Sequence, residues 1–280
     1  MAENYIKYKT FVINMKKNPD RLLFMTNQMR ELSITFDIQE GIDGQDIHFE
    51  RMYGHYFNDD LSRKDMGQKL RLGEKGCALS HMKVLEKAIE EDLDYVLILE
   101  DDVELHQDFK KTIERVLKDR HHNKSKWDYL SFNYPTPGLH NIRLWLFLIS
   151  IMYSESNQKR NFIINTPIYF LKFLITVSFS LFEGAREYFC LKRKGGHIFT
   201  SYRPLYLAGC YLVSRVGIKK LLSVSQEIIY AADRLQNIAK KKSGLKLCVY
   251  VPLLAKQRRD KFDSTMFENK EIAKKYFFNN

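Results

Sequence analysis

Three consecutive acidic residues, Glu100-Asp101-Asp102, directly follow the apolar run Tyr95–Leu99 (YVLIL). A continuous apolar run of this length is typical of a strand buried on both faces, so the carboxylates are predicted where a buried strand emerges. Like charges this close repel one another in a low dielectric unless something neutralises them. Carboxylate oxygens suit Mg²⁺ or Mn²⁺, and substrate phosphates can fill the remaining ligand positions. The triplet therefore indicates a metal site for a phosphorylated substrate, although many strands end in solvated acids.

The three carboxylates are expected to differ in role. Alternate residues of an extended chain point to opposite faces, so Glu100 and Asp102 should share one face and Asp101 the other. We expect Asp102 to bind the metal, and Glu100 or Asp101 to hold a sugar hydroxyl or a ribose. A metal here would offset the charge that develops on a diphosphate leaving group.

Strands and helices alternate along the chain, which predicts an α/β fold with a mainly parallel sheet flanked by helices. Predicted strands are Thr10–Met15, Thr35–Gln39, Tyr95–Leu99, Leu205–Ser214 and Leu245–Val251. Helical spacing of apolar residues begins at Pro19, recurs from Ala78 to Ile89, and recurs again over Val216–Val224, while a polar stretch runs to about Leu72. Ligands of such sheets bind at the carboxyl ends of the strands.

An apolar insert at about residues 138–196 interrupts this pattern. Leu144–Tyr153 is ten residues without a charge, and Phe162–Phe182 is twenty-one mostly apolar residues. A spanning helix needs about 20 apolar residues, so the first run is too short and the second is borderline. A single span would also place the acidic triplet and the last third of the chain on opposite sides of the membrane. We predict one domain, residues 1–280, whose helical insert faces a membrane or the acceptor; a pair of core or dimer-forming helices is the alternative.

The charge of the 280-residue chain is unevenly placed. Lys and Arg number 45 and Asp and Glu 34, giving a net charge of +11, yet residues 184–280 alone hold 20 basic and 7 acidic side chains. Such a surface attracts nucleic acid, anionic lipid or a phosphorylated glycan. Four widely spaced cysteines favour a reducing compartment, and the first residues lack the pattern of a secretory signal. We expect a cytoplasmic protein lying peripherally on the inner membrane, against anionic lipid.

Five segments occur in an order that is similar to glycosyltransferase family 25, the lipooligosaccharide and lipopolysaccharide galactosyltransferase group of Gram-negative bacteria. They are FVINMKKNPDR (Phe11–Arg21), LGEKGCALSH (Leu72–His81), VLILEDD (Val96–Asp102), LAGCYLVSRVGIKKLL (Leu207–Leu222) and VPLLAKQ…DST (Val251–Thr265). The resemblance implies a GT-A-like, Rossmann-type fold and a UDP-hexose donor, most often UDP-galactose. It also implies inverting transfer to a glycan or glycolipid acceptor with Mn²⁺ or Mg²⁺ as cofactor.

The resemblance also carries site residues onto this chain. The family's acidic motif falls on Glu100-Asp101-Asp102, and its first strand and turn place Ile13, Asn14 and Arg21 near the nucleotide. Its G-E-x-G-C-x-x-S-H segment falls on Gly73, Glu74, Gly76, Cys77, Ser80 and His81. The glycines are expected to let the backbone approach a ligand or to form a plain helix-entry turn. Ser80 and His81, one turn into the helix, are expected to reach the donor or to be structural, and Cys77 to be a packing residue.

Inverting transfer needs a base that takes the proton of the acceptor hydroxyl. A P-x-D element of the family maps only loosely onto Ala231-Ala232-Asp233-Arg234, because the proline is absent. Asp233 is the expected catalytic base, and an ion pair with Arg234 or a nearby lysine is the structural alternative.

Other classes explain only part of the sequence. A nucleic-acid-binding protein would explain the basic third, but no helix-turn-helix, RNP or zinc-finger pattern occurs. A metal-dependent nucleotidyltransferase would explain the acidic triplet, but NMKKNPDR after the first strand is not a Gly-rich phosphate loop. A membrane scaffold would explain the insert alone.

Overall fold

The computed structural model describes residues 6–123, 127–134, 196–201, 204–258 and 260–262. The chain divides into two units, one formed by residues 1–134 and 198–280 and the other by residues 135–197. Nearly all of the second unit, and with it the predicted insert at 138–196, lies outside the described residues. Among the residues that are described, no helix combines the length and apolarity needed to cross a bilayer.

Strands and helices alternate through the first half of the described chain. In order they are β1 Tyr8–Asn14, α1 Pro19–Glu31, β2 Asp37–Glu40, α2 Phe49–Tyr53, the 3₁₀ turn η1 Gly54–Tyr56, α3 Asp59–Met66, α4 Leu72–Glu90, β3 Tyr95–Glu100, β4 Val103–Leu105, α5 Phe109–Asn123 and β5 Tyr129–Ser131. The later elements are β6 His197–Thr200, β7 Cys210–Ser214, α8 Arg215–Ser223, α9 Ala232–Ser243, β8 Leu247–Val251 and β9 Ala255–Gln257.

Seven strands form the central sheet in the order β2-β1-β3-β7-β5-β8-β6, and β4 pairs with β9 in a separate two-stranded sheet. β1 is parallel to both β2 and β3, and β5 is parallel to β8. β7 is antiparallel to both of its neighbours, β3 and β5. The predicted α/β fold with a mainly parallel sheet is therefore confirmed.

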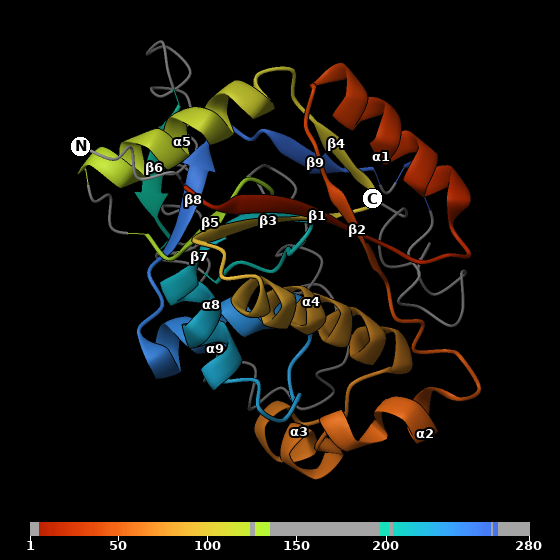
Figure 1. Ribbon diagram of the computed structural model, residues 1–280. Coiled ribbons are helices and arrows are strands. Elements are labelled where there is room, and N and C mark those ends of the chain that lie inside the picture. Colours follow the sequence, from red (N-terminus) through yellow and green to blue (C-terminus); the bar gives the residue numbers. More distant parts are fainter. Residues whose placement is uncertain (1–5, 124–126, 135–195, 202–203, 259, 263–280) are drawn as a thin grey trace, which may run out of the picture. The chain divides into compact units, whose positions relative to one another are not determined.

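Helices cover both faces of the sheet (Figure 1). Apolar residues of α1 and α5, such as Met25 and Val116, pack with Val12, Leu97 and Leu212 in one buried cluster. Helices α4, α8 and α9 contact one another on the opposite face. Because side chains alternate along a strand, the residues between those of the first cluster, such as Tyr211, face α4.

The strand order reverses at β1. β2 lies on one side of β1, and the chain then returns through α4 to place β3 on the other side. Open α/β sheets bind ligands at the carboxyl ends of the strands where such a reversal occurs. In this chain those ends are Asn14 of β1 and Glu100 of β3, and Ile13 and Glu100 are register partners.

The structure differs from the sequence prediction in several elements. The stretch before Leu72 was predicted as merely polar, but it contains α2, η1 and α3, and α5 and α9 were not predicted. The short helices depend on tertiary contacts: the Ser62 hydroxyl donates to the Ile229 carbonyl, and Phe57 forms a β-bridge with Ile228. The strand predicted from Leu205 begins only at Cys210.

Candidate active site

A pocket lies at the carboxyl ends of β1 and β3, against the first turns of α4. The described residues that line it are Ile13, Met15, Arg21, Gly41, Ile42, Asp43, Gly44, Gly73, Cys77, Ser80, His81, Glu100, Asp101, Asp102, Gln257 and Phe262. The pocket therefore gathers most of the predicted site residues in one place; Asn14, Glu74 and Asp233 do not line it.

Side-chain alternation at the end of β3 sends neighbouring carboxylates in opposite directions. Glu100 faces α4, where its Oε1 lies 3.3 Å from Nε2 of His81. Asp101 faces α1 and lies 3.0 Å from the guanidinium of Arg21. The expected separation of Glu100 from Asp101 is thus present, and it follows from the pleat of the strand.

Asp101 is buried and held by two donors. The Asn14 amide donates to Oδ2 at 2.7 Å, and Arg21 donates to Oδ1 at 3.0 Å. Burial raises the pKa of Asp101, while Arg21 and Asn14 lower it. Asn14 donates also to the carbonyl of Asn18, so it ties the β1–α1 turn to the acidic residues. These three residues hold one another in place at the wall of the pocket, which Arg21 and Asp101 line.

Asp102 is the least compensated of the three carboxylates. Burial and the charge of Glu100 raise its pKa to about 7, against the lowering effect of Arg21, whose guanidinium lies 3.8 Å away. The Gln257 amide donates to Glu100 at 2.6 Å and to Asp102 at 3.4 Å. The pairing of Val103 with Gln257 between β4 and β9 places this amide beside both acids.

The carboxylates that line the pocket fit the binding of a divalent cation. Four carboxylates, Asp43, Glu100, Asp101 and Asp102, line the pocket, and Arg21 is the one Lys or Arg among its described lining residues. Arg21 is already paired with Asp101. A cation bound by Glu100 and Asp102 would offset the charge that raises the pKa of Asp102.

The loop at Gly41–Gly44 is fixed against α4 by close backbone contact. A Cβ on Gly76 would lie 2.4 Å from the carbonyl oxygen of Ile42 and 2.7 Å from the amide nitrogen of Gly44. The Ser80 hydroxyl accepts from the amide of Ile42 at 2.8 Å and donates to the carbonyl of Gly76 at 2.7 Å. Gly76 and Ser80 therefore shape the pocket wall by contacting protein, and Gly76 lies within the helix, not in a turn before it.

The other residues of the G-E-x-G-C-x-x-S-H segment also have local partners. Gly73 lies in the first turn of α4, and the Glu74 side chain accepts from the amide of Arg71 at 2.8 Å, which caps that helix. His81 was predicted one turn into the helix but lies near its middle, because α4 begins at Leu72. Its Nδ1 lies 2.9 Å from the Tyr211 hydroxyl and its Nε2 faces Glu100.

Cys77 points toward Glu100, with 4.0 Å between Sγ and Oε1. Burial, together with the charges of Glu100 and Asp233, raises the pKa of its thiol well above the ordinary value. Without a bound metal the Cys77 thiol is therefore protonated at neutral pH, and it is a poor nucleophile. The described cysteines Cys77, Cys210 and Cys248 are free thiols.

Asp233 lies in the first turn of α9, outside the lining of the pocket. Burial raises its pKa to about 6; Arg234 lowers it, and Glu100 and Glu74 raise it. The Asp233 carboxylate therefore interacts electrostatically with Glu100, which lines the pocket.

Several described residues of the site were not singled out from the sequence, among them Met15 and the loop Gly41–Gly44, which line the pocket, and Gln257, Tyr211 and Phe262. Gln257 and Tyr211 fall inside segments that resemble the family, VPLLAKQ and LAGCYLVS, but their types alone gave no functional signal. Phe262 lies against the Arg21 guanidinium, 5.3 Å from ring centroid to Cζ. The pairing of β9 with β4 brings Gln257 to Glu100, and the pairing of β7 with β3 brings Tyr211 to His81.

The structure is thus that of an α/β protein with an acidic pocket at the strand ends. Comparison with known families identifies the family: residues 7–236 match the model described as "Glycosyltransferase family 25 (LPS biosynthesis protein)". The chain belongs to glycosyltransferase family 25, as its motifs predicted.

The chain is also similar to parts of longer animal proteins. It is 30% identical over 125 residues to a rat protein named "Probable inactive glycosyltransferase 25 family member 3", covering 44% of this chain and 22% of the rat protein. It is 28% identical over 122 residues to mouse "Procollagen galactosyltransferase 2", covering 43% of this chain and 20% of the mouse protein. The matched segments thus span about a fifth of these relatives.

Proposed function

We propose that the protein is an inverting, metal-dependent glycosyltransferase that transfers a hexose, galactose from UDP-galactose, to a surface glycan acceptor. The observation that carries the proposal is the acidic pocket at the ends of β1 and β3 in a chain of glycosyltransferase family 25. The name of the mouse relative, a procollagen galactosyltransferase, supports galactose as the sugar.

The electrostatics of the pocket support metal dependence. A diphosphate that enters it meets four carboxylates and one guanidinium that is already paired. Such a ligand would be repelled unless a divalent cation came with it. Mn²⁺ or Mg²⁺, held by Glu100 and Asp102, would supply charge neutralisation for the leaving diphosphate.

The protein's own residues then bind and orient the donor. Ile13 and Met15 at the end of β1 and the loop Gly41–Gly44 form the wall that we assign to the nucleotide. Arg21 and Asn14 hold Asp101 in place, and Gln257 orients Glu100 and Asp102. His81, bound between Tyr211 and Glu100, fixes the direction of the Glu100 carboxylate.

Asp233 is our proposed base. With a pKa of about 6, it is mostly ionised at neutral pH and still basic enough to take a proton from an acceptor hydroxyl as the sugar carbon is attacked. The proton passes to the carboxylate as the bond from the hydroxyl oxygen to the anomeric carbon forms, and the diphosphate leaves from the opposite face.

We further propose a lipooligosaccharide or lipopolysaccharide acceptor, and a cytoplasmic protein held peripherally on the inner membrane. The support is the matched model's description as a lipopolysaccharide biosynthesis protein and the basic composition of residues 184–280.

The decisive test is release of UDP from a panel of UDP-galactose, UDP-glucose and UDP-N-acetylhexosamines, with Mn²⁺, with Mg²⁺ and with a chelator. We expect metal-dependent release that is fastest with UDP-galactose. Asp102→Asn should lose this activity, and Asp108→Asn, which changes an exposed acid next to α5, should keep it. Absence of metal-dependent release from every donor would overturn the proposal, as would tight DNA binding without turnover.

A further inference from the structure

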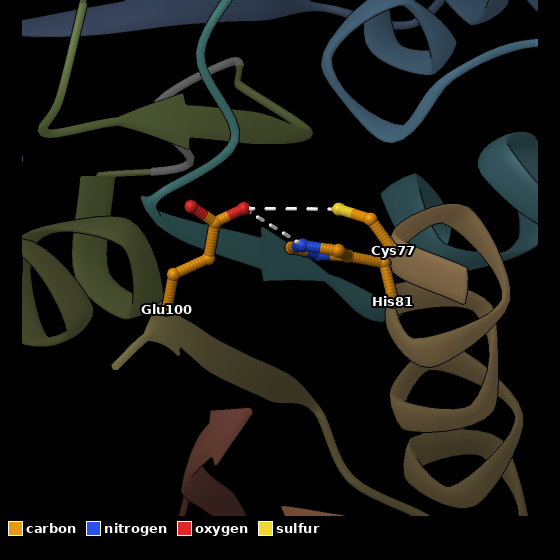
Figure 2. A group of neighbouring side chains, drawn as sticks. All are labelled: Cys77, His81 and Glu100. Carbon is orange, nitrogen blue, oxygen red and sulfur yellow. Dashed lines mark hydrogen bonds and ion pairs between the residues drawn. The ribbon is translucent and has the colours of Figure 1, made fainter. Parts of the chain in front are cut away.

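Cys77, His81 and Glu100 converge on one point beside the pocket (Figure 2). Cys77 and His81 lie one turn apart on α4, and Glu100 reaches them from the end of β3. One ligand atom from each residue, a sulfur, a ring nitrogen and a carboxylate oxygen, lies within 4.8 Å of the other two.

The spacing of these atoms matches the coordination of a small divalent cation. Zn²⁺ binds nitrogen and oxygen at about 2.0–2.2 Å and sulfur at about 2.3 Å, so two ligands of a tetrahedral ion lie about 3.3–3.7 Å apart. Here the His81 nitrogen is 3.3 Å and the Cys77 sulfur 4.0 Å from the Glu100 oxygen. Small side-chain movements would bring all three into contact with one ion.

Neighbouring residues orient two of the three ligands. The Tyr211 hydroxyl holds Nδ1 of His81 at 2.9 Å, and its ring stacks on the imidazole with the planes 18° apart. Gln257 donates to Oε2 of Glu100 at 2.6 Å. Nε2 of His81 and Oε1 of Glu100 then face each other at 3.3 Å, and the Cys77 sulfur lies within 4.8 Å of both. Partners of this kind are what metal-binding histidines and carboxylates have in protein sites.

We propose that Cys77, His81 and Glu100 form a binding site for Zn²⁺ or a similarly thiophilic divalent cation, with its fourth position open toward the pocket. A sulfur and an imidazole select such an ion over Mg²⁺, which prefers oxygen ligands. Binding forms a metal–sulfur bond and releases the thiol proton to solvent. All three residues line the pocket, so the ion can enter from that side.

The proposal adds a second class of cation to this corner of the molecule. Glu100 belongs to both sites, so Zn²⁺ should compete with Mn²⁺ or Mg²⁺ for this carboxylate. That competition rests on the proposed function, whereas the binding of Zn²⁺ does not.

The test uses Cd²⁺, a thiophilic substitute whose bond to a thiolate gives an ultraviolet charge-transfer band. The protein is titrated in a Cys190→Ser background, so that Cys77, Cys210 and Cys248 are the remaining thiols. We expect one equivalent of Cd²⁺ to produce the band and Zn²⁺ to abolish it by displacement. Cys77→Ser should remove the band, and Cys248→Ala, which removes a buried thiol of β8, should leave it intact.

Two further measurements keep the test decisive. Tyr211→Phe removes only the hydroxyl behind His81 and should weaken Cd²⁺ binding by roughly 10–100-fold. In the wild-type protein, Zn²⁺ but not Mg²⁺ should slow alkylation of Cys77, measured by peptide mass spectrometry. A charge-transfer band that persists in Cys77→Ser, or alkylation of Cys77 that Zn²⁺ leaves unchanged, would overturn the proposal whether or not UDP is released in the transferase assay.

Discussion

Three adjacent carboxylates in this protein differ because each faces a different neighbour. Asp101 is paired with Arg21 and Asn14, Glu100 lies beside His81, and Asp102 keeps a pKa of about 7 because burial and Glu100 outweigh the effect of Arg21. Burial of a charge is tolerated where a partner compensates it. We therefore assign Asp101 a structural role and propose Glu100 and Asp102 as the acids that bind the cation.

Arg21→Met tests this division at the level of stability. The substitution leaves the Asp101 carboxylate buried without its guanidinium, and breaking a buried ion pair in this way costs roughly 3–5 kcal/mol. We expect a loss of this size in the free energy of unfolding, measured by urea titration. The double variant Arg21→Met/Asp101→Asn should be less destabilised than the sum of its two single variants.

Lys16→Met is the matched control, since Lys16 and Glu40 form an exposed ion pair near the same end of the sheet. Exposed pairs contribute less than about 1 kcal/mol. If Arg21→Met and Lys16→Met lowered the free energy of unfolding by equal amounts, the buried pair of Arg21 and Asp101 would have no special structural role.

Asp233→Asn tests the proposed base. The amide cannot accept the proton, so kcat should fall by roughly 10²–10⁴-fold. The Kd for UDP-galactose, measured by calorimetry, should change little, because Asp233 does not line the pocket. Unchanged turnover would exclude Asp233 as the base.

The same residue predicts a pH dependence. Burial raises the pKa of Asp233 to about 6, so the carboxylate gains its proton, and loses its function as a base, as the pH falls through about 6. In the wild-type protein kcat should therefore fall on the acid side of pH 6. The residual activity of Asp233→Asn should lack this limb of the profile.

At the scale of elements, the pocket depends on how closely the Gly41–Gly44 loop approaches α4. The approach is possible because Gly76 lacks a side chain and because Ser80 holds the amide of Ile42. The backbone of the loop lies directly against Gly76 of the helix, so we expect a small increase in side-chain volume at this contact to change the shape of the pocket.

Gly76→Ala places a methyl group 2.4 Å from the Ile42 carbonyl oxygen and must displace the loop. Overpacking of this kind costs roughly 1–3 kcal/mol. We expect a lower melting temperature and a raised KM for the donor. Glu90→Ala, at the exposed end of the same helix, is the control and should change neither. An unaltered KM in Gly76→Ala would show that the loop does not contact the donor.

At the scale of the whole molecule, the last third of the chain differs in charge from the rest. Residues 184–280 have 20 basic and 7 acidic side chains, whereas the whole chain has 45 and 34. Each Lys or Arg near an anionic membrane surface contributes about 1 kcal/mol to binding. The excess of basic over acidic side chains in residues 184–280 is large enough to hold a protein on an anionic membrane if several of the basic residues reach the surface together.

Flotation with vesicles tests this expectation. The protein should float with vesicles rich in anionic phospholipid at physiological salt, stay behind with neutral vesicles, and dissociate as the salt concentration rises. Replacing Lys192, Arg193 and Lys194 by Glu should weaken binding. Failure of the wild-type protein to float with anionic vesicles would exclude membrane docking.

The amino-acid sequence by itself determined the class of fold and the place of the site. Apolar runs such as Tyr95–Leu99 identify buried strands, because a strand covered on both faces excludes polar residues. The acidic triplet after that strand predicted a site at this end of the sheet, where the structure has a pocket, and ordered motifs identified the family. These are local signals, so they can be read without knowing which strands are neighbours.

Tertiary structure alone decided what each site residue contacts. Gln257 lies far along the chain from Glu100, and only the pairing of β4 with β9 brings the two together. Tyr211 reaches His81 because β7 inserts antiparallel beside β3. The convergence of Cys77, His81 and Glu100 likewise depends on how α4 packs on the sheet. Long-range pairing is set by the packing of the whole core, and no short stretch of sequence encodes it.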